Sequence, residues 1–176
     1  KPRLLWCILP TVWDLLVRPE IGDDAYQSSA SAIAMKLYYS DTFELPLPAG
    51  HRFPMAKYGR LRERVLSSDW GTNCQLELPP PASDAELQLV HEREYLRRVM
   101  TGELSELEQR RIGFPWSVKM VERCRRSTGA SVAASQAALH DRVAVNMAGG
   151  THHAMPDAGS GYCVFNDVAV AGRVLQ

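Results

Sequence analysis

The sequence lacks several features that mark specialised classes of protein. Its four cysteines are scattered through 176 residues without a Cys-x-x-Cys pair. This disfavours a disulfide scaffold or a cysteine-rich zinc site, and it favours a reducing compartment, so we expect a cytoplasmic protein. Lys and Arg number 20, as do Asp and Glu, which leaves a formal net charge of 0. A neutral chain argues against direct nucleic-acid binding through a broad basic face.

A long apolar run is also missing. Residues 4–17 (LLWCILPTVWDLLV) are mostly apolar, but they include Pro10 and Asp14. A membrane-spanning helix needs roughly 20 apolar residues, so we expect no membrane segment. A signal peptide is the alternative, although the acidic stretch that follows is long for one. We interpret residues 1–34 as a leader outside the domain, which we expect to begin at Met35 and to span 35–176.

Strand and helix patterns follow Met35. Residues 36–39 are β-prone, and residues 56–66 suit a short helix. Apolar residues recur at helical intervals over 117–139, where Gly129 permits close approach by a neighbour. Residues 142–147 (RVAVNM) are short, β-branched and apolar, as is typical of a strand buried on both faces. A buried strand after a long helix favours an α/β domain with a parallel sheet.

A further helix is predicted between these segments. Ser83 and Glu86 have the S-x-x-E spacing of a capping box, in which each side chain bonds a free amide at the helix start. We expect the helix to continue with Leu89 and Leu96 on one apolar face. It should end at Gly102, since glycine readily adopts the left-handed backbone of a helix end.

The residues with the clearest chemical potential follow the last strand. Residues 149–154 read GGTHHA, and ligands of open α/β sheets bind at the carboxyl ends of strands. The adjacent His152 and His153 suit general acid and base catalysis, because imidazole titrates near neutrality. They could instead bind a metal, or form a hydrogen-bonded pair that braces a turn, and the spacing leaves all three open. Structural or surface roles are predicted for the other histidines, His51, His91 and His140.

Residues 149–171 (GGTHHAMPDAGSGYCVFNDVAVA) resemble the signature of the histone deacetylase family, and are most similar to its bacterial members and the class IV-like branch. Three upstream segments look like the N-terminal third of that family, in the right order: Gly50–Val65, Ala82–Val99 and Arg110–Ala134. The resemblance extends over about residues 35–176 and not over residues 1–34.

The resemblance implies an arginase/deacetylase-type α/β fold, with a parallel sheet between helical layers, and zinc-dependent hydrolysis of an acylated amine, typically acetyl-lysine. It assigns His153 as general base and acid, and His152 as the residue that tunes the site. Tyr162 would form one wall of the acyl-lysine tunnel, and the backbone of Gly161 would line it. Lys57 falls where class I relatives carry an arginine that faces an internal product channel.

One part of the family pattern is missing. Members of the family bind zinc through a D-x-D-x-H strand and a later aspartate, and a tyrosine further on polarises the carbonyl. All of these lie downstream of the G-[YF]-C-x-x-N-D run. We therefore expect no metal ligand in this chain, a zinc ion in the full-length protein, and a chain that is the N-terminal part of a truncated deacetylase domain, inactive alone.

Three functions stay open at this point. The first is a deacetylase of acetylated lysine in proteins. The second is a deacetylase of acetylated polyamines or other small acetylated amines. The third is a module without catalysis that binds acyl-lysine or a partner through the helical face Leu89–Met100. The sequence does not predict an oligomeric state.

Overall fold

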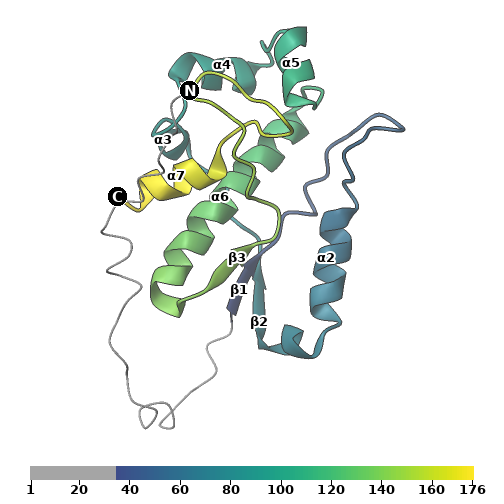
Figure 1. Ribbon diagram of the computed structural model, residues 1–176, viewed down its shortest axis with the longest axis vertical. Helices are drawn as coiled ribbons and strands as arrows, with labels where there is room; N and C mark the ends of the chain where they lie inside the picture. The colour runs from purple at the N-terminus through teal and green to yellow at the C-terminus, as the bar shows by residue number, and fades with distance from the viewer. Residues whose placement is uncertain (1–34) are drawn as a thin grey trace, which may run out of the picture. The chain divides into compact units, whose positions relative to one another are not determined.

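The computed structural model describes residues 35–176, so the leader expected at 1–34 lies outside the described residues. The elements occur in the following order along the chain (Figure 1): β1 (Met35–Tyr38), α2 (Lys57–Leu66), the 3₁₀ helix η2 (Asp69–Asn73), β2 (Cys74–Glu77), α3 (Asp84–Leu87), α4 (Arg93–Thr101), α5 (Glu106–Ile112), α6 (Val118–Asp141), β3 (Ala144–Asn146) and α7 (Asp167–Val174). Within this part of the chain the strands form one parallel sheet in the order β2-β1-β3. The predicted α/β class with a parallel sheet is confirmed.

The central strand β1 is covered on both faces. Leu37 pairs with Leu76 of β2 and with Val145 of β3, and both Leu37 and Tyr38 are buried. Tyr38 packs against three small residues of α6: Ala130, Ala134 and Ala137. Small side chains on α6 let this helix lie close to the sheet, and so α6 forms the layer on one face.

The edge strand β3 differs from its prediction. Ala144 packs with the cluster on α6, and Asn146 donates hydrogen bonds to the same helix. Between them, Val145 faces the other way and is 37% exposed, since successive side chains of a strand alternate between faces. The expectation of a strand buried on both faces is therefore wrong for the described residues, in which β3 has one neighbouring strand and one covering helix.

Strand β2 was not predicted. It reads CQLE and alternates polar with less polar residues, without any β-branched side chain. Its pairing with β1, from Met35 opposite Cys74 to Tyr38 opposite Glu77, supplies the backbone partners that define it. A strand that depends on a partner so far along the chain leaves a weak local signal.

The helix predicted from Ser83 to Gly102 is two helices. The capping box is confirmed, with the Glu86 amide donating to Ser83 Oγ at 3.2 Å and the Ser83 amide donating to a Glu86 carboxylate oxygen at 2.6 Å. The helix stops after one turn, where the amides of Leu89 and Val90 donate to carbonyls only three residues back, and the Glu92 amide then donates to the Pro156 carbonyl. Helix α4 then begins and ends at Gly102, whose φ of 83° confirms the predicted stop.

This break changes the apolar face predicted from Leu89 to Met100. Leu89 is exposed between the two helices, whereas Leu96 and Val99 of α4 are buried in the main core. The face is therefore occupied by the protein's own core, and it does not offer a free surface for a partner.

Helix α5 was also missed, although its start has a clear signal. Ser105 and Glu108 form a second capping box, and the helix ends at Gly113 with a φ of 88°. The predicted long helix is confirmed as α6, and the backbone at Pro80 lies so close to Gly129 that a Cβ there would overlap it. Val118 and Leu139 are exposed at the two ends of the helix.

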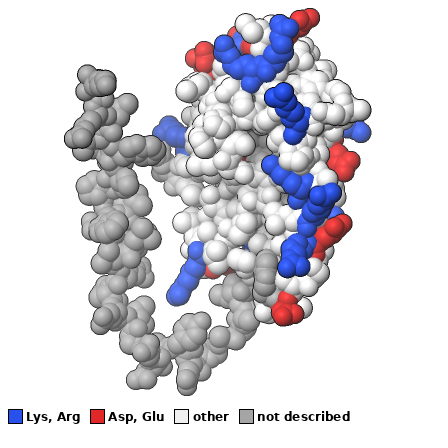
Figure 2. Space-filling view, turned by 45° about the vertical axis from the view of Figure 1, so that its right-hand side comes forward, with Lys and Arg blue, Asp and Glu red and all other residues white. Residues whose placement is uncertain are grey.

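The main core is built by helices α3 to α7 and the connections between them, with residues such as Leu87, Val99, Ile112, Met120 and Val170 at its centre. On the face shown in Figure 2, Lys and Arg side chains are interspersed with Asp and Glu side chains. None of the helices in residues 35–176 combines the length and the apolar character that a membrane crossing requires.

Candidate functional site

The loop Gly149–Ala154, called the histidine loop below, leaves the carboxyl end of β3. Its two imidazole rings, of His152 and His153, lie with their centroids 4.6 Å apart and their planes tilted by 38°. Both side chains are exposed. Within residues 35–176 the ring nitrogens form no hydrogen bond, so they do not brace the turn. The structure thus brings the predicted pair together at a strand end.

Gly161 lies directly against the histidine pair. Its φ is 56°, and a Cβ at this position would sit 3.2 Å from Cδ2 of His153. The hydroxyl of Ser160 donates to the carbonyl of His153 at 3.0 Å, which joins the two loops next to the ring. A glycine is therefore needed here both for its backbone conformation and for room beside the imidazole.

Tyr162 has a left-handed backbone, with a φ of 64°, that is unusual for a residue with a side chain. The end of α5 holds it in place, because the amides of Gly161 and Tyr162 donate to the carbonyls of Arg111 and Ile112 at 3.0 and 2.6 Å. These are carbonyls that a helix end leaves without a partner. The two predicted substrate-binding residues are thus positioned by one helix terminus.

The ring of Tyr162 joins an aromatic cluster. Its centroid lies 5.0 Å from that of Phe53 and 5.1 Å from that of Phe114, and Phe53 and Phe114 meet edge to face at 4.9 Å. His51 completes the cluster at 6.2 Å from the Tyr162 ring, and its Nε2 bonds the carbonyl of Gly113 at 2.9 Å. His51 therefore has the structural role predicted for it.

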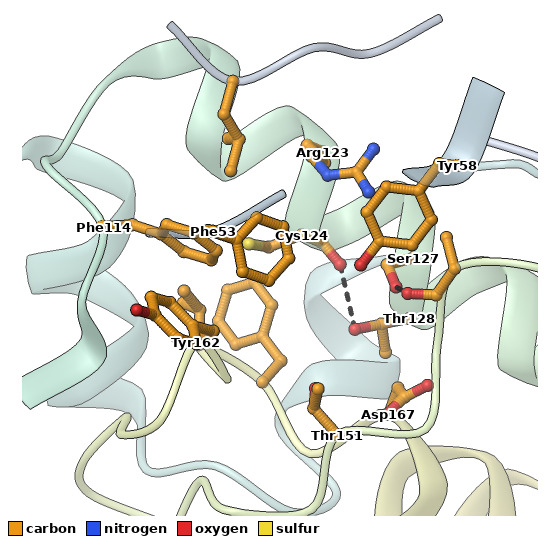
Figure 3. A pocket seen from close by; sticks show the side chains of 14 residues that line it. Phe53, Tyr58, Phe114, Arg123, Cys124, Ser127, Thr128, Thr151, Tyr162 and Asp167 are labelled. Atoms are coloured by element: carbon orange, nitrogen blue, oxygen red, sulfur yellow. Dashed lines mark hydrogen bonds between the residues drawn. The ribbon is translucent and has the colours of Figure 1, made fainter. Parts of the chain in front are cut away.

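A cavity with about 470 Å³ of unfilled space, part of it open to solvent, adjoins this cluster. Figure 3 shows the rings of Phe53, Phe114 and Tyr162 gathered on one side of it. The polar residues of its wall are Tyr58, Arg123, Ser127, Thr128, Thr151 and Asp167. Thr151 belongs to the histidine loop, but neither histidine lines the cavity. The cavity wall therefore includes the residue just before the histidine pair, but not the two imidazole rings.

Arg123 is the buried cation of this wall, and the sequence reasoning missed it. Its guanidinium donates to the carbonyls of Ser40 and Phe43 at 2.8 and 3.2 Å and lies 4.4 Å from the centre of the Tyr58 ring. An arginine on the apolar side of a predicted helix is the signal that could have found it. Lys57, the residue expected at an internal channel, is not part of this wall, and its amine lies over the Phe53 ring at 4.7 Å.

With the site described, comparison with known proteins decides the family. The histone deacetylase domain family matches residues 51–176. The chain belongs to the histone deacetylase family. A solved structure of an HDAC homologue from Aquifex aeolicus is similar to this chain, with a TM-score of 0.63 and 26% sequence identity, over 80% of this chain and 41% of that one.

Curated proteins are also similar to this chain. An uncharacterized protein of Picosynechococcus sp. is 41% identical over 138 residues, which are 78% of this chain and 46% of that protein. A histone deacetylase-like amidohydrolase of Pseudomonas aeruginosa is 31% identical over 149 residues, which are 81% of this chain and 38% of that protein. The chain therefore spans about half, or less, of the length of these relatives.

A second histidine region of the chain has a structural role. His91 is 3% exposed, its Nδ1 bonds the Met155 carbonyl at 3.1 Å, and its Nε2 accepts from the Asn166 amide at 3.0 Å. Nδ1 must carry the proton for both bonds to form. Burial lowers the pKa of His91, outweighing the opposite effect of the backbone carbonyls beside it. The structural role predicted for His91 is confirmed, and His140 is exposed at the end of α6, as a surface residue would be.

A catalytic zinc site normally has three protein ligands. Among residues 35–176, no three or more His, Cys, Asp or Glu side chains are grouped so that they could hold a metal ion. The described residues therefore do not fit a catalytic zinc.

Proposed function

We propose that the protein is a deacetylase that hydrolyses the acetyl-lysine amide, and that this chain carries the acid/base part of its active site. The observation that carries the proposal is the exposed pair His152 and His153, side by side next to Gly161 in a member of the histone deacetylase family. Hydrolase and deacetylase chemistry belongs to the family. The acetyl-lysine substrate is our assignment for this protein.

Amide hydrolysis needs two proton transfers. A base takes a proton from the attacking water, and an acid delivers a proton to the departing amine, which one imidazole can do in turn. We assign this role to His153, because its ring lies against Gly161, where the substrate is expected to pass. The ring of His152, 4.6 Å away, is the neighbour that we assign to tune the electrostatics of the site.

The substrate's acylated side chain is long, apolar and narrow. Gly161 offers backbone without a side chain, and Tyr162 offers an aromatic ring that is held rigidly by Phe53 and Phe114. A flat ring next to a residue without a side chain suits a methylene chain, because it offers apolar contact without blocking the chain. We propose that Gly161 and Tyr162 bind this part of the substrate.

Proteins of this family are generally zinc-dependent, and we propose the same for this one. Since residues 35–176 contain no group of three or more candidate ligands, we propose that the ligand set is completed from outside them. The relatives in the comparison are at least about twice the length of the matched region, so the remaining half of such a domain is the source we propose.

The test compares this chain with the protein extended to the length of its relatives. Both are assayed with zinc on an acetyl-lysine peptide and on an acetylated polyamine, each with and without a chelator. We expect the extended protein to hydrolyse the peptide in a chelator-sensitive way and this chain to be inactive. Preference for the polyamine would favour a small-amine deacetylase. If neither amide is hydrolysed, the deacetylase proposal fails, and chelator-sensitive turnover by this chain alone would contradict the proposed source of the ligands.

A further inference from the structure

Two consecutive residues at the start of α7 hold the histidine loop near both of its ends. Asp167 Oδ2 accepts a hydrogen bond from the Gly150 amide at 2.9 Å. Asn166 Nδ2 donates to the carbonyl of Ala154 at 3.2 Å and, at the limit of hydrogen-bond length, to that of His152 at 3.5 Å. The backbone that carries the two imidazoles is therefore held by hydrogen bonds to these two side chains.

The direction of the bonds to Asp167 follows from the atoms around it. Asn146 Oδ1 accepts from the Ala148 amide at 2.9 Å, so its Nδ2 must be the atom that donates to Ser131 Oγ, at 2.8 Å. Since Ser131 Oγ accepts that proton, its own hydroxyl proton points to Asp167 Oδ2. The same carboxylate oxygen thus accepts from α6 and from the histidine loop. A hydrogen-bond acceptor is therefore required at position 167. The Asp167 carboxylate links the histidine loop directly to α6 and, through Ser131 and Asn146, to β3.

The atoms around the Asp167 carboxylate are tightly packed. A Cβ at Gly149 would overlap both Asn146 Nδ2 and Asp167 Oδ2. Asp167 is 2% exposed, and its other carboxylate oxygen has no hydrogen-bond partner in the described part of the chain. Burying a carboxylate in this way costs free energy, so the position of Asp167 is better explained by its bonds to the loop than by solubility or surface charge.

Asn166 is oriented just as firmly. Its Oδ1 accepts from the Ala169 amide at 3.1 Å and so caps α7, which leaves Nδ2 facing the loop. Its backbone amide donates to His91 Nε2, and His91 in turn bonds the Met155 carbonyl. Capping α7 requires the oxygen of Asn166 alone. The bonds from Nδ2 to the loop are additional, and an aspartate or serine cap would lack them.

Within residues 35–176, the imidazole rings of His152 and His153 contact few other groups. Each lies against the other, and His153 also lies against Gly161, while both side chains are exposed. Their placement is therefore set by the backbone that carries them. We propose that Asn166 and Asp167 are positioning residues that set where His152 and His153 present their rings, an inference that rests on the proposed acid/base function of the pair.

The first experiment does not depend on activity. Amide and histidine-ring resonances are recorded by NMR for ¹⁵N-labelled chain carrying Asn166→Asp, with Asn73→Asp as the matched control at an exposed residue. Aspartate keeps the cap on α7 but replaces a donor with an acceptor that faces two carbonyls. We expect shifts at Thr151–Ala154 and in both histidine rings, with the Ala169 amide still protected from exchange. Asn73→Asp should leave all of these unchanged.

A second pair of variants tests Asp167. Asp167→Asn retains one oxygen that can accept from Gly150, whereas Asp167→Ala retains none. We expect the alanine variant to lose the exchange protection of the Gly150 amide and the asparagine variant to recover most of it. If Asn166→Asp does not fold, Asn166→Ser replaces it, because serine caps a helix but does not reach the loop carbonyls. Unchanged loop resonances in the folded Asn166 variant and in Asp167→Ala would overturn the proposal.

The third readout is kinetic and uses the zinc-loaded protein extended to the length of its relatives. Misplacing a catalytic group by about 1 Å can cost on the order of 10²-fold in rate. We therefore expect Asn166→Asp to lower kcat by between about ten- and a hundredfold with KM little changed, and Asn73→Asp to leave both unchanged. A wild-type protein without activity would refute the proposed function, while the NMR variants would still decide the positioning role. An active enzyme whose kcat is insensitive to Asn166→Asp would refute the positioning role alone.

Discussion

Two histidine regions of this protein lie close in the fold and differ in almost every physical respect. His91 is buried between α3 and α4, and both ring nitrogens are engaged by backbone groups. His152 and His153 are exposed, and their ring nitrogens have no partner within residues 35–176. Asn166 contacts both regions, with its backbone amide on His91 and its side chain on the histidine loop.

The difference shows which histidine can serve chemistry. A ring whose two nitrogens are both bonded in a buried site is held in one neutral form, and protonating it would break a bond. A ring with free nitrogens can take up and release a proton without disturbing the fold. The first kind stabilises the structure, and the second is available for catalysis.

His153→Ala should abolish most catalysis in the zinc-loaded, extended protein. Positioned acid/base catalysis contributes typically ~10²–10⁴-fold in rate, which corresponds to about 3–5 kcal/mol of activation free energy. Because the side chain is exposed, the melting temperature should stay close to wild type, and so should the zinc content. Turnover, melting temperature and metal content are measured together, with His140→Ala as the control. Loss of zinc from the variant would identify His153 as a ligand and contradict the assignment.

His91→Ala should show the opposite pattern, with a large loss of stability. It leaves the Met155 carbonyl and the Asn166 amide without their partner, and an unsatisfied buried polar group costs about 1–3 kcal/mol. We expect the free energy of unfolding to fall by about 2–4 kcal/mol in urea titrations. His140→Ala, at an exposed site, should change it little. An equal effect of the two substitutions would show that burial does not distinguish these histidines.

Gly161→Ala should destabilise the protein moderately and disturb His153. A left-handed backbone costs a residue with a Cβ about 1–2 kcal/mol, and the new methyl group would press on the imidazole. The control is Gly172→Ala in α7, where a Cβ would meet nothing within 4 Å. There alanine should instead stabilise the helix by about 0.5–1 kcal/mol. Thermal melts of the two variants should therefore move in opposite directions, and a shared direction would count against the backbone argument.

The pKa of His91 gives the smallest effect, and its sign follows from linkage. Burial lowers this pKa below the ordinary value of 6.5, so the unfolded chain binds more protons between the two values. Stability is therefore complete above pH 6.5 and falls as the pH decreases below it, by at most about 1.4 kcal/mol per pH unit. Urea titrations at about pH 7.5 and about pH 5.5 measure this loss. His91→Gln should reduce it, whereas His140→Gln should not, and an unchanged loss in His91→Gln would exclude His91 as its source.

Local signals predicted much of this fold. The capping box at Ser83, the left-handed glycine at Gly102 and the regular apolar spacing of α6 each involve residues within a few positions of one another. The same holds for the adjacent histidines, which have to share a loop. For this reason the sequence alone determined where several helices start and stop, the parallel α/β class, and the presence of a histidine pair after a strand. The resemblance to deacetylases rested on such short motifs as well.

Other features of the fold depend on partners far apart in the chain. Strand β2 exists because it pairs with β1, and the segment between α3 and α4 is tied by its Glu92 amide to the carbonyl of Pro156. The bond from Asp167 to Gly150, and the burial of Arg123 beneath Tyr58, likewise join segments that no local pattern connects. Which side chains meet across such distances depends on how the whole core packs, because each contact is worth little until the others hold the backbone in place.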